Sequence, residues 1–217
     1  MQNLVTVLGI IIRTEPIGEF DRRLVILTRE KGKITVFARG ARRQNNRFLA
    51  TTTPFCFGEF VLFTGHNSYS LSEANISHFF EEIRSDYENS LYGMYFMELA
   101  DYYTRESKDE ADQLKLLFQS LRALASGRYG RKFLKAVYEI KTIMINGEFP
   151  GIPDRRDDLA GMDKVIRFLW ECRPEKVYTF AVSERLEQEM IQTGETAVKN
   201  MIDKKLNTLE LLETLTE

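Results

Sequence analysis

Apolar residues follow two different periodic patterns in the two parts of the chain. Up to about residue 75, apolar residues come in short runs or at alternate positions, separated by glycine, proline and asparagine, which is typical of strands and turns. From about residue 76 they recur every three or four positions, as on the buried side of a helix. The pattern predicts an α+β protein, with a five-stranded β-barrel domain over residues 1–78 and an all-helical domain over 79–217.

The first part contains five segments with strand character. Residues 3–14 are almost entirely apolar and predict a strand that is buried on both faces. Further strands are expected at residues 20–29, 33–39, 55–64 and from Tyr69 onward, with turns at Pro16 to Gly18, at Lys31-Gly32 and at 65–68. Five short strands with a glycine bend at Gly58 predict an OB-fold, with another small β-barrel as the alternative.

Phenylalanines crowd the fourth predicted strand, at positions 55, 57, 60 and 63. They could form a platform on which nucleic-acid bases stack, or they could fill the barrel interior. Large apolar side chains at strand spacing usually lie inside, so we interpret most of them as core.

The second part predicts a bundle of amphipathic helices, because each apolar stripe needs a neighbour to bury it. Gly127 and Gly194 are expected to end helices, and Ser183 to cap one at its start. Trp170 is placed on the apolar stripe of its helix. Residues 147–158 hold two prolines, two glycines and six charges, so a surface loop is expected there. The helices are predicted at residues 90–104, 112–125, 131–146, 159–170 and from 184, with a last one running to the C-terminus.

Charge is spread unevenly. The formal net charge is −2, yet residues 1–80 hold ten Lys and Arg against six Asp and Glu. The densest stretch is 29–47, with seven cations and one acid. Its strand places Ile34, Val36 and Ala38 on one face, and Gly40 then opens a basic loop. Guanidinium and ammonium groups on a strand edge and a loop suit phosphate binding.

This stretch therefore supplies the candidate nucleic-acid-binding residues, although a solvated basic hairpin with no ligand is the alternative. The candidates are Lys31, Lys33, Arg39, Arg42, Arg43 and Arg47.

A longer pattern surrounds these residues. The run from Gly18 to Ile34 contains an acidic pair, a strand ending in Leu-Thr and a Gly-Lys turn, and it leads into Ala-Arg-Gly-Ala-Arg-Arg at residues 38–43. It resembles the N-terminal domain of the RecO family of bacterial recombination mediators, and the resemblance extends over nearly the whole chain.

The resemblance implies a non-enzymatic DNA repair protein that binds single- and double-stranded DNA and anneals complementary strands. It also implies that the protein helps to load RecA recombinase together with RecR, and that it binds the acidic, apolar C-terminal tail of the single-stranded-DNA-binding protein. No small-molecule substrate, cofactor or membrane is expected. The expected location is the cytoplasm, near the nucleoid.

One feature of the family is missing. Many members carry a four-cysteine zinc site after a Gly-x-x-Pro loop, which here is residues 147–150, and no cysteines follow it. Asp154, Asp157 and Asp158 stand nearby, but three carboxylates on a surface loop make a poor zinc site. The only cysteines are Cys56 and Cys172, which have no ligand spacing with either histidine. We therefore predict no structural zinc or other metal.

A second cationic cluster falls in the helical part, and it is the candidate site for an acidic partner such as that tail. Complementing helix C-terminal dipoles is the alternative explanation for its first members. The cluster consists of Arg122, Arg128, Arg131, Lys132 and Lys135.

No catalytic set is evident. Phosphate-cradling glycine loops, Gly-x-Ser-x-Gly and His-Glu-x-x-His are all absent. Acid pairs such as Glu81-Glu82 lie in polar helix ends, where solvated charge is the ordinary role. Two further hypotheses therefore stand beside the mediator: a protein–protein adaptor of the same fold that does not bind DNA, and a hydrolase with no motif behind it.

Overall fold

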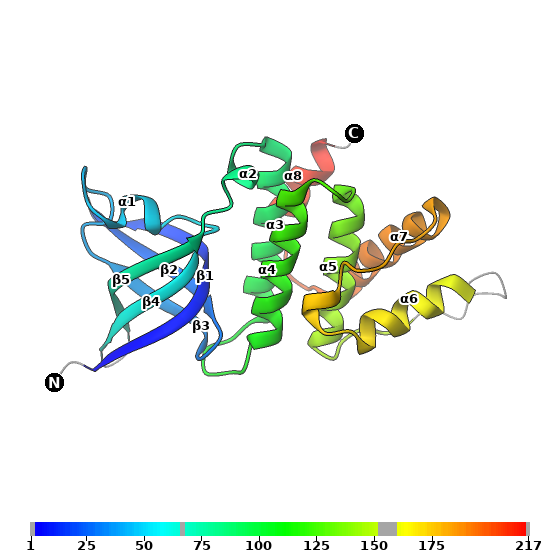
Figure 1. Ribbon diagram of the computed structural model, residues 1–217, viewed down its shortest axis with the longest axis horizontal. Helices are drawn as coiled ribbons and strands as arrows, with labels where there is room; N and C mark the ends of the chain where they lie inside the picture. Colours follow the sequence, from blue (N-terminus) through cyan, green and yellow to red (C-terminus); the bar gives the residue numbers. More distant parts are fainter. Residues whose placement is uncertain (1–2, 66–67, 152–159, 216–217) are drawn as a thin grey trace. The chain divides into compact units, whose positions relative to one another are not determined.

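The computed structural model describes residues 3–65, 68–151 and 160–215. The chain forms two compact units (Figure 1). One comprises residues 1–81 together with 101–114, and the other comprises 82–100 together with 115–217. The expected domain boundary after residue 78 stays a prediction about independent folding.

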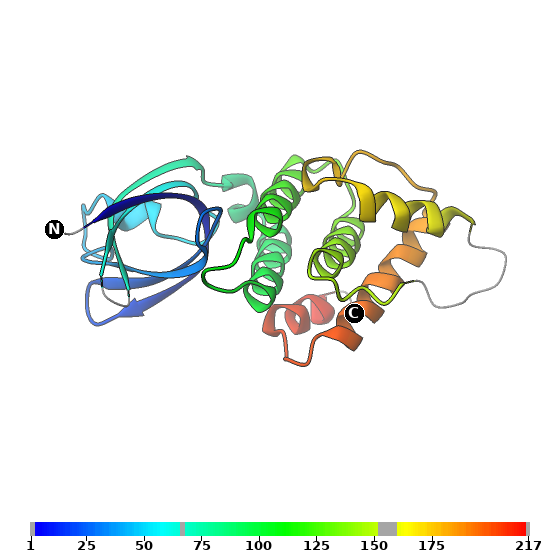
Figure 2. The ribbon, with the colours of Figure 1, turned by 90° about the horizontal axis from the view of Figure 1, so that it is seen from below.

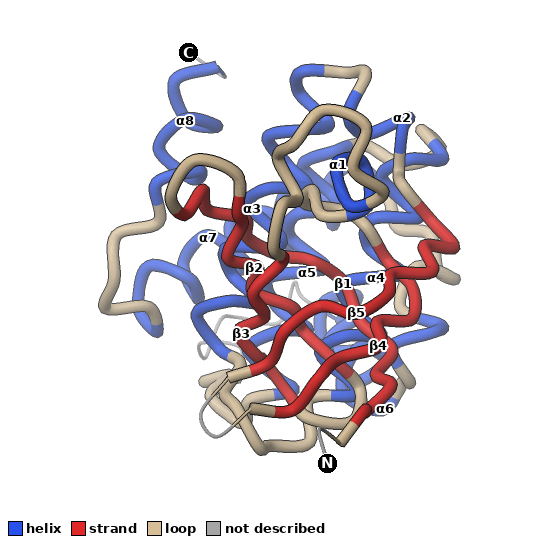
Figure 3. The backbone as a smooth tube through the Cα atoms, turned by 90° about the vertical axis from the view of Figure 1, so that its left-hand side faces the viewer, coloured by secondary structure: helices blue, strands red, loops and turns tan. Residues whose placement is uncertain are grey.

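The first unit is a closed β-barrel (Figure 3). Its strands hydrogen-bond in the order β1-β2-β3-β5-β4, with β4 returning to β1. The short helix α1 (Phe48–Thr51) lies between β3 and β4 in the chain. A five-stranded barrel of this kind is an OB-fold, as the sequence predicted. The strands are β1 (Leu4–Ile17), β2 (Asp21–Thr28), β3 (Gly32–Ala38), β4 (Phe57–Thr64) and β5 (Tyr69–His78).

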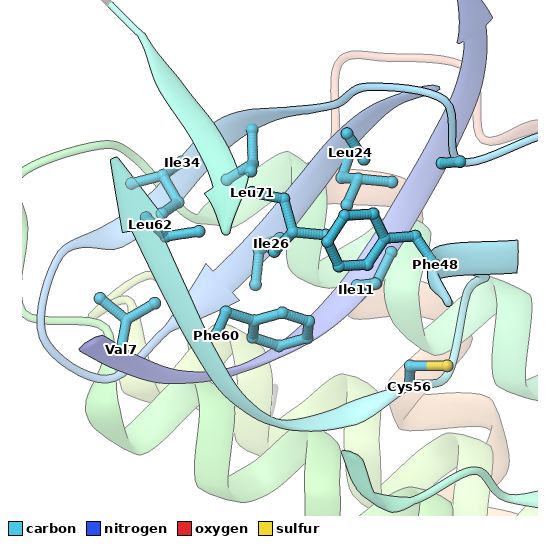
Figure 4. Close-up of a cluster of buried hydrophobic side chains, with 13 residues drawn as sticks. Val7, Ile11, Leu24, Ile26, Ile34, Phe48, Cys56, Phe60, Leu62 and Leu71 are labelled. Atoms are coloured by element: carbon cyan, nitrogen blue, oxygen red, sulfur yellow. The ribbon is translucent and has the colours of Figure 1, made fainter. Parts of the chain in front are cut away.

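Alternation along the strands fills the barrel interior (Figure 4). On β3, Ile34, Val36 and Ala38 are buried, which confirms the predicted face. Phe48 of α1 packs against the same cluster and closes it at the α1 end. Phe60 on β4 is fully buried, so the core interpretation holds for it. Residues 57 and 63 are only half-buried.

The first strand is longer than predicted. It continues through Pro16 to Ile17, and Pro16 pairs with Arg22 at the end of the β1–β2 ladder. A proline is tolerated there because it closes the strand instead of interrupting its centre. The turn itself follows at Gly18, whose φ is 53°. The predicted turn at 65–68 includes residues 66–67, which lie outside the described part.

The second unit is a helical bundle (Figure 2). Helix α5 is its centre, since every residue from Phe133 to Met144 is buried, and α7 packs along it. Helix α3 ends and helix α4 begins within residues 101–114, which belong to the first unit. The helices are α2 (Glu81–Arg84), α3 (Tyr87–Tyr103), α4 (Ala111–Ser126), α5 (Arg131–Ile145), α6 (Ala160–Glu171), the 3₁₀ turn η1 (Pro174–Lys176), α7 (Glu184–Met201) and α8 (Asn207–Leu215).

Two of the three predicted helix signals are confirmed. Ser183 accepts a hydrogen bond from the Leu186 amide at the start of α7, and Gly127 adopts a φ of 63° after α4. Gly194 does not end a helix, because α7 continues through it to Met201. A Cβ at position 194 would lie 2.6 Å from Glu139 Oε2 and 3.2 Å from the Ala136 Cα. The glycine therefore permits the close crossing of α5 and α7.

Two further expectations about helices were wrong. Trp170 is 58% exposed, because it lies about 100° around α6 from the buried Leu169, at the edge of the apolar stripe. The last helix is also broken, at residues 202–206. The chain restarts as α8, whose first amides, of Asn207 and Thr208, donate to the Glu98 carboxylate at 3.0 and 2.9 Å. A side chain of α3 thus caps the C-terminal helix. The predicted loop at 147–158 lies largely outside the described residues.

A buried ion pair lies within α5, and a tyrosine of α3 hydrogen-bonds to it. The Lys135 ammonium lies 3.0 Å from Glu139 Oε1, and the Tyr95 hydroxyl donates to the same oxygen at 2.5 Å. Glu139 Oε2 is buried without a hydrogen-bond partner. Burial raises the pKa of Glu139, against the lowering effect of Lys135. The carboxylate therefore depends on the lysine for its charge.

Candidate nucleic-acid interface

The six predicted cations of the barrel fall at opposite ends of β3. Lys31 precedes the strand and Lys33 is its second residue, whereas the four arginines follow the other end. A seven-residue strand spans about 23 Å at 3.3 Å per residue. The structure therefore separates the predicted set into two groups.

Lys33 is already engaged. Its ammonium lies 2.8 Å from Asp101 Oδ1 and donates to the Asp101 carbonyl at 2.6 Å. The Lys33 amide donates to the Arg105 carbonyl at 3.0 Å, so backbone and side chain both contact segment 101–114. Gly32 makes this approach possible, because a Cβ there would lie 2.3 Å from the same carbonyl. This ion pair leaves Lys33 little capacity for a phosphate.

Lys31 lies beside a polar cavity of about 600 Å³ near the same hairpin. Its ammonium is 5.9 Å from the centre of the Tyr69 ring. Because the cations of the lining are matched by carboxylates, the cavity offers no net attraction for an anion. The charged lining consists of Arg29, Lys31 and Lys108 with Glu30, Glu106 and Asp109.

The four remaining cations belong to the arginine loop, residues 39–47. Gly40 turns the chain at the end of β3 with a φ of 66°, and its amide donates to Asp21 Oδ1 at 2.7 Å. Ala41 is fully buried in the barrel core. The Arg42 amide donates to the Phe20 carbonyl at 2.8 Å. These contacts attach the loop to the turn before β2 and to the first residue of that strand.

The arginine side chains lie on the surface of this loop. The Arg43 guanidinium lies 4.8 Å from the centre of the Phe20 ring, and that of Arg47 lies 4.7 Å from the Phe48 ring. Arg47 also donates to the Ser72 carbonyl at 2.6 Å. Within the described residues, none of the loop's four arginines forms an ion pair with a carboxylate. Aromatic faces orient the guanidinium groups of Arg43 and Arg47 without neutralising them.

Arg22 was missed by the sequence argument. Its guanidinium donates to the Leu49 carbonyl at 2.9 Å and to Thr52 Oγ1 at 2.8 Å, so it ties α1 to β2. Burial lowers the pKa of Arg22, and the nearby charge of Arg42 lowers it further. Periodicity gave no signal for this contact, because a four-residue helix is too short to show a repeat.

The predicted cluster of the helical unit does not form one patch. Arg131 opens α5 beside Glu88 at 2.8 Å and Asp86 at 3.3 Å, which explains a cation at a helix start. Lys135 is buried in its ion pair. The exposed members are Arg122, Arg128 and Lys132.

Of these three, only Lys132 lines a groove that lies between α5, α7 and α8. Its larger part has a volume of about 580 Å³ and an apolar floor that includes Val198, Ile202, Leu206 and Leu209. Lys132 lines the adjoining smaller part.

Within the described residues, no group of three or more His, Cys, Asp and Glu could hold a metal ion. In the same part of the chain, no helix is long and apolar enough to cross a bilayer.

Taken together, the described residues of the barrel gather exposed cations without carboxylate partners at the arginine loop. Guanidinium groups bind phosphate oxygens, and phosphates carry no base identity, so this site suits sequence-independent contact with a nucleic-acid backbone.

Comparison with known proteins points the same way. The family model described as Recombination protein O N terminal matches residues 1–80, and the one described as Recombination protein O C terminal matches residues 84–150. The chain is 24% identical to the DNA repair protein RecO of Clostridium novyi, over 95% of this chain and 93% of the relative. It is 26% identical to RecO of Clostridium perfringens, over 96% and 97%. Identity to RecO of Bacillus pumilus is 34%, over 65% and 55%.

Proposed function

Because the chain belongs to the RecO family of DNA repair proteins, we propose that it is a non-enzymatic recombination mediator. In this proposal it binds single- and double-stranded DNA, anneals complementary strands and, with RecR, helps to load RecA recombinase. One observation of the structure supports DNA binding above the others: within the described residues the four arginines of the arginine loop form no ion pair with a carboxylate, and hydrogen bonds or ring contacts orient the guanidinium groups of Arg42, Arg43 and Arg47.

The mechanism follows from charge. Two DNA strands repel each other through their phosphates, and a protein that neutralises phosphates on both lets them approach. The arginine loop supplies Arg39, Arg42, Arg43 and Arg47 for this purpose. No base is read, so the base pairing of the strands themselves decides which of them anneal.

The proposal is tested by fluorescence anisotropy of a labelled single-stranded oligonucleotide at several salt concentrations. Four phosphate contacts on a single strand predict a slope of about −2.8 for log K against log salt. Binding should be indifferent to sequence, and complementary strands should anneal faster with the protein present. No binding at low salt would instead favour an adaptor without DNA binding, which the net charge of −2 would suit.

The sequence pattern places Lys33 among the DNA-binding residues, whereas the structure pairs it with Asp101, and the two interpretations predict different results. Replacing Lys33 with methionine should leave DNA affinity within about twofold, because its charge is already held by Asp101. The free energy of unfolding should fall by about 1 kcal/mol as the ion pair is lost. Anisotropy and urea unfolding of the same variant check both parts. A clearly smaller salt slope in the variant would show instead that Lys33 contacts a DNA phosphate.

The partner tail is proposed to bind in the groove between α5, α7 and α8. Its apolar end would contact the apolar lining of the groove. The lysines of the lining are matched by glutamates such as Glu195 and Glu213, so the acidic part would depend on the exposed Lys132 and not on a net positive charge of the groove. We expect Lys132→Glu to weaken binding of a labelled tail peptide about fivefold, because an opposite charge on the rim repels acids. Arg122→Glu, an equal charge reversal on α4, serves as the control. Equal losses in both variants would argue against the groove.

A further inference from the structure

One of the residues that contact the arginine loop is an acid, Asp21. Asp21 Oδ1 accepts the Gly40 amide at 2.7 Å, at the point where β3 ends and the loop begins. Gly40 has a φ of 66°, so the chain turns sharply there. A carboxylate is a strong acceptor for a backbone amide, and this bond fixes the direction in which the loop leaves the strand. On charge alone, the same carboxylate would repel DNA.

A second contact comes from the residue before it. The Phe20 carbonyl accepts the Arg42 amide at 2.8 Å, and the Phe20 ring lies 4.8 Å below the Arg43 guanidinium. Such stacking is attractive and restricts the rotamers of the arginine. The short turn at residues 18–20 and the first residue of β2, Asp21, therefore contact both the backbone and a side chain of the arginine loop.

We infer that Asp21 and Phe20 are positioning residues of the DNA site: they hold the arginine loop in its binding conformation and do not contact DNA themselves. The inference rests on the proposed function. A loop that is ordered before binding loses less conformational freedom when DNA arrives, and apparent affinity scales with the fraction of protein in the competent state. The benefit of order then outweighs the repulsion by one carboxylate.

The two effects predict opposite signs for Asp21→Ala. If repulsion governs, removing the acid tightens DNA binding about twofold. If positioning governs, binding weakens about fivefold because the loop is no longer held. Glu19→Ala is the matched control, since Glu19 is an exposed acid of the same turn with no contact to the loop among the described residues. Its loss should leave binding equal or slightly tighter. Asp21→Ala binding as tightly as Glu19→Ala would overturn the inference.

Asp21→Asn separates the hydrogen bond from the charge. The amide oxygen of asparagine can still accept from Gly40, so this variant should bind DNA at least as well as the parent. Affinity as low as that of Asp21→Ala would reject the acceptor role. Phe20→Leu covers the case in which Asp21→Ala does not fold. This change removes the ring under Arg43, so affinity should drop two- to fivefold. It keeps every cation, so the salt slope should stay unchanged. An unchanged affinity would remove Phe20 from the inference.

A readout without DNA tests the inference independently of the proposed function. Hydrogen exchange of the Gly40 amide, followed by NMR on the full-length protein, should be roughly tenfold faster in Asp21→Ala than in the parent or in Glu19→Ala. If the parent protein bound no DNA, the proposed function would fail, yet this exchange would still show whether Asp21 orders the loop. Unchanged protection would show that it does not.

Discussion

Replacing Arg39, Arg42 and Arg43 with alanine should weaken single-stranded DNA binding about 50-fold at 0.15 M salt. The physical reason is counterion release, since each lost phosphate contact removes about 0.7 from the log–log salt slope. The slope should therefore fall from about −2.8 to about −0.7, with Arg47 as the remaining contact. Anisotropy titrations at four or five salt concentrations measure both quantities.

The control removes equal charge elsewhere. Lys164, Arg167 and Arg173 are exposed cations of the helical unit, and their triple replacement with alanine changes the net charge by the same amount. Affinity should then change little and the slope should persist. If both triple variants flattened the slope equally, binding would depend on overall charge and not on the arginine loop.

Replacing Lys135 with methionine should lower the free energy of unfolding of the helical unit by about 3 kcal/mol at neutral pH. The change leaves the Glu139 carboxylate buried with no cation at 3.0 Å. The remaining Tyr95 hydrogen bond does not replace the lost charge. Denaturant unfolding followed by fluorescence can report this, because the chain's single tryptophan, Trp170, lies in α6 of the same unit.

The loss should depend on pH with a defined sign. Burial raises the pKa of Glu139 in the folded protein, so the folded state holds its proton to higher pH than the unfolded state does. Stability therefore falls as pH rises from the ordinary glutamate pKa of about 4.3 through the raised value. The destabilisation in Lys135→Met should shrink toward acidic pH. Adding Glu139→Gln should restore much of the stability; a double variant no more stable than the single one would contradict this account.

Local patterns predicted the barrel well. The alternation of Ile34, Val36 and Ala38 identified the buried face of β3, and the spacing of five short strands identified the OB-fold. The cation-rich stretch also located the arginine loop. Each of these features depends on residues that are near one another in sequence. The two-residue period and the turn residues therefore predict them directly.

Long-range contacts were beyond such patterns. Lys33 and Arg43 look equivalent as sequence, yet one faces Asp101, 68 residues away, and the other faces the ring of Phe20. Gly194 resembles a helix end because glycine is common there, whereas it actually serves the approach of α5 to α7. Charge and helix signals alone cannot distinguish these cases, since tertiary packing decides them.

The attachment of segment 101–114 to the barrel has a practical consequence for dissecting the protein. A recombinant fragment that stops at residue 81 would omit Asp101 and Arg105, which hold Lys33 by its side chain and its backbone. The β2–β3 hairpin of such a fragment would present a bare ammonium and an unpaired amide. Low stability of an isolated barrel cut at that position would then reflect a damaged hairpin. Fragments that extend to residue 114 keep these partners and make the fairer comparison.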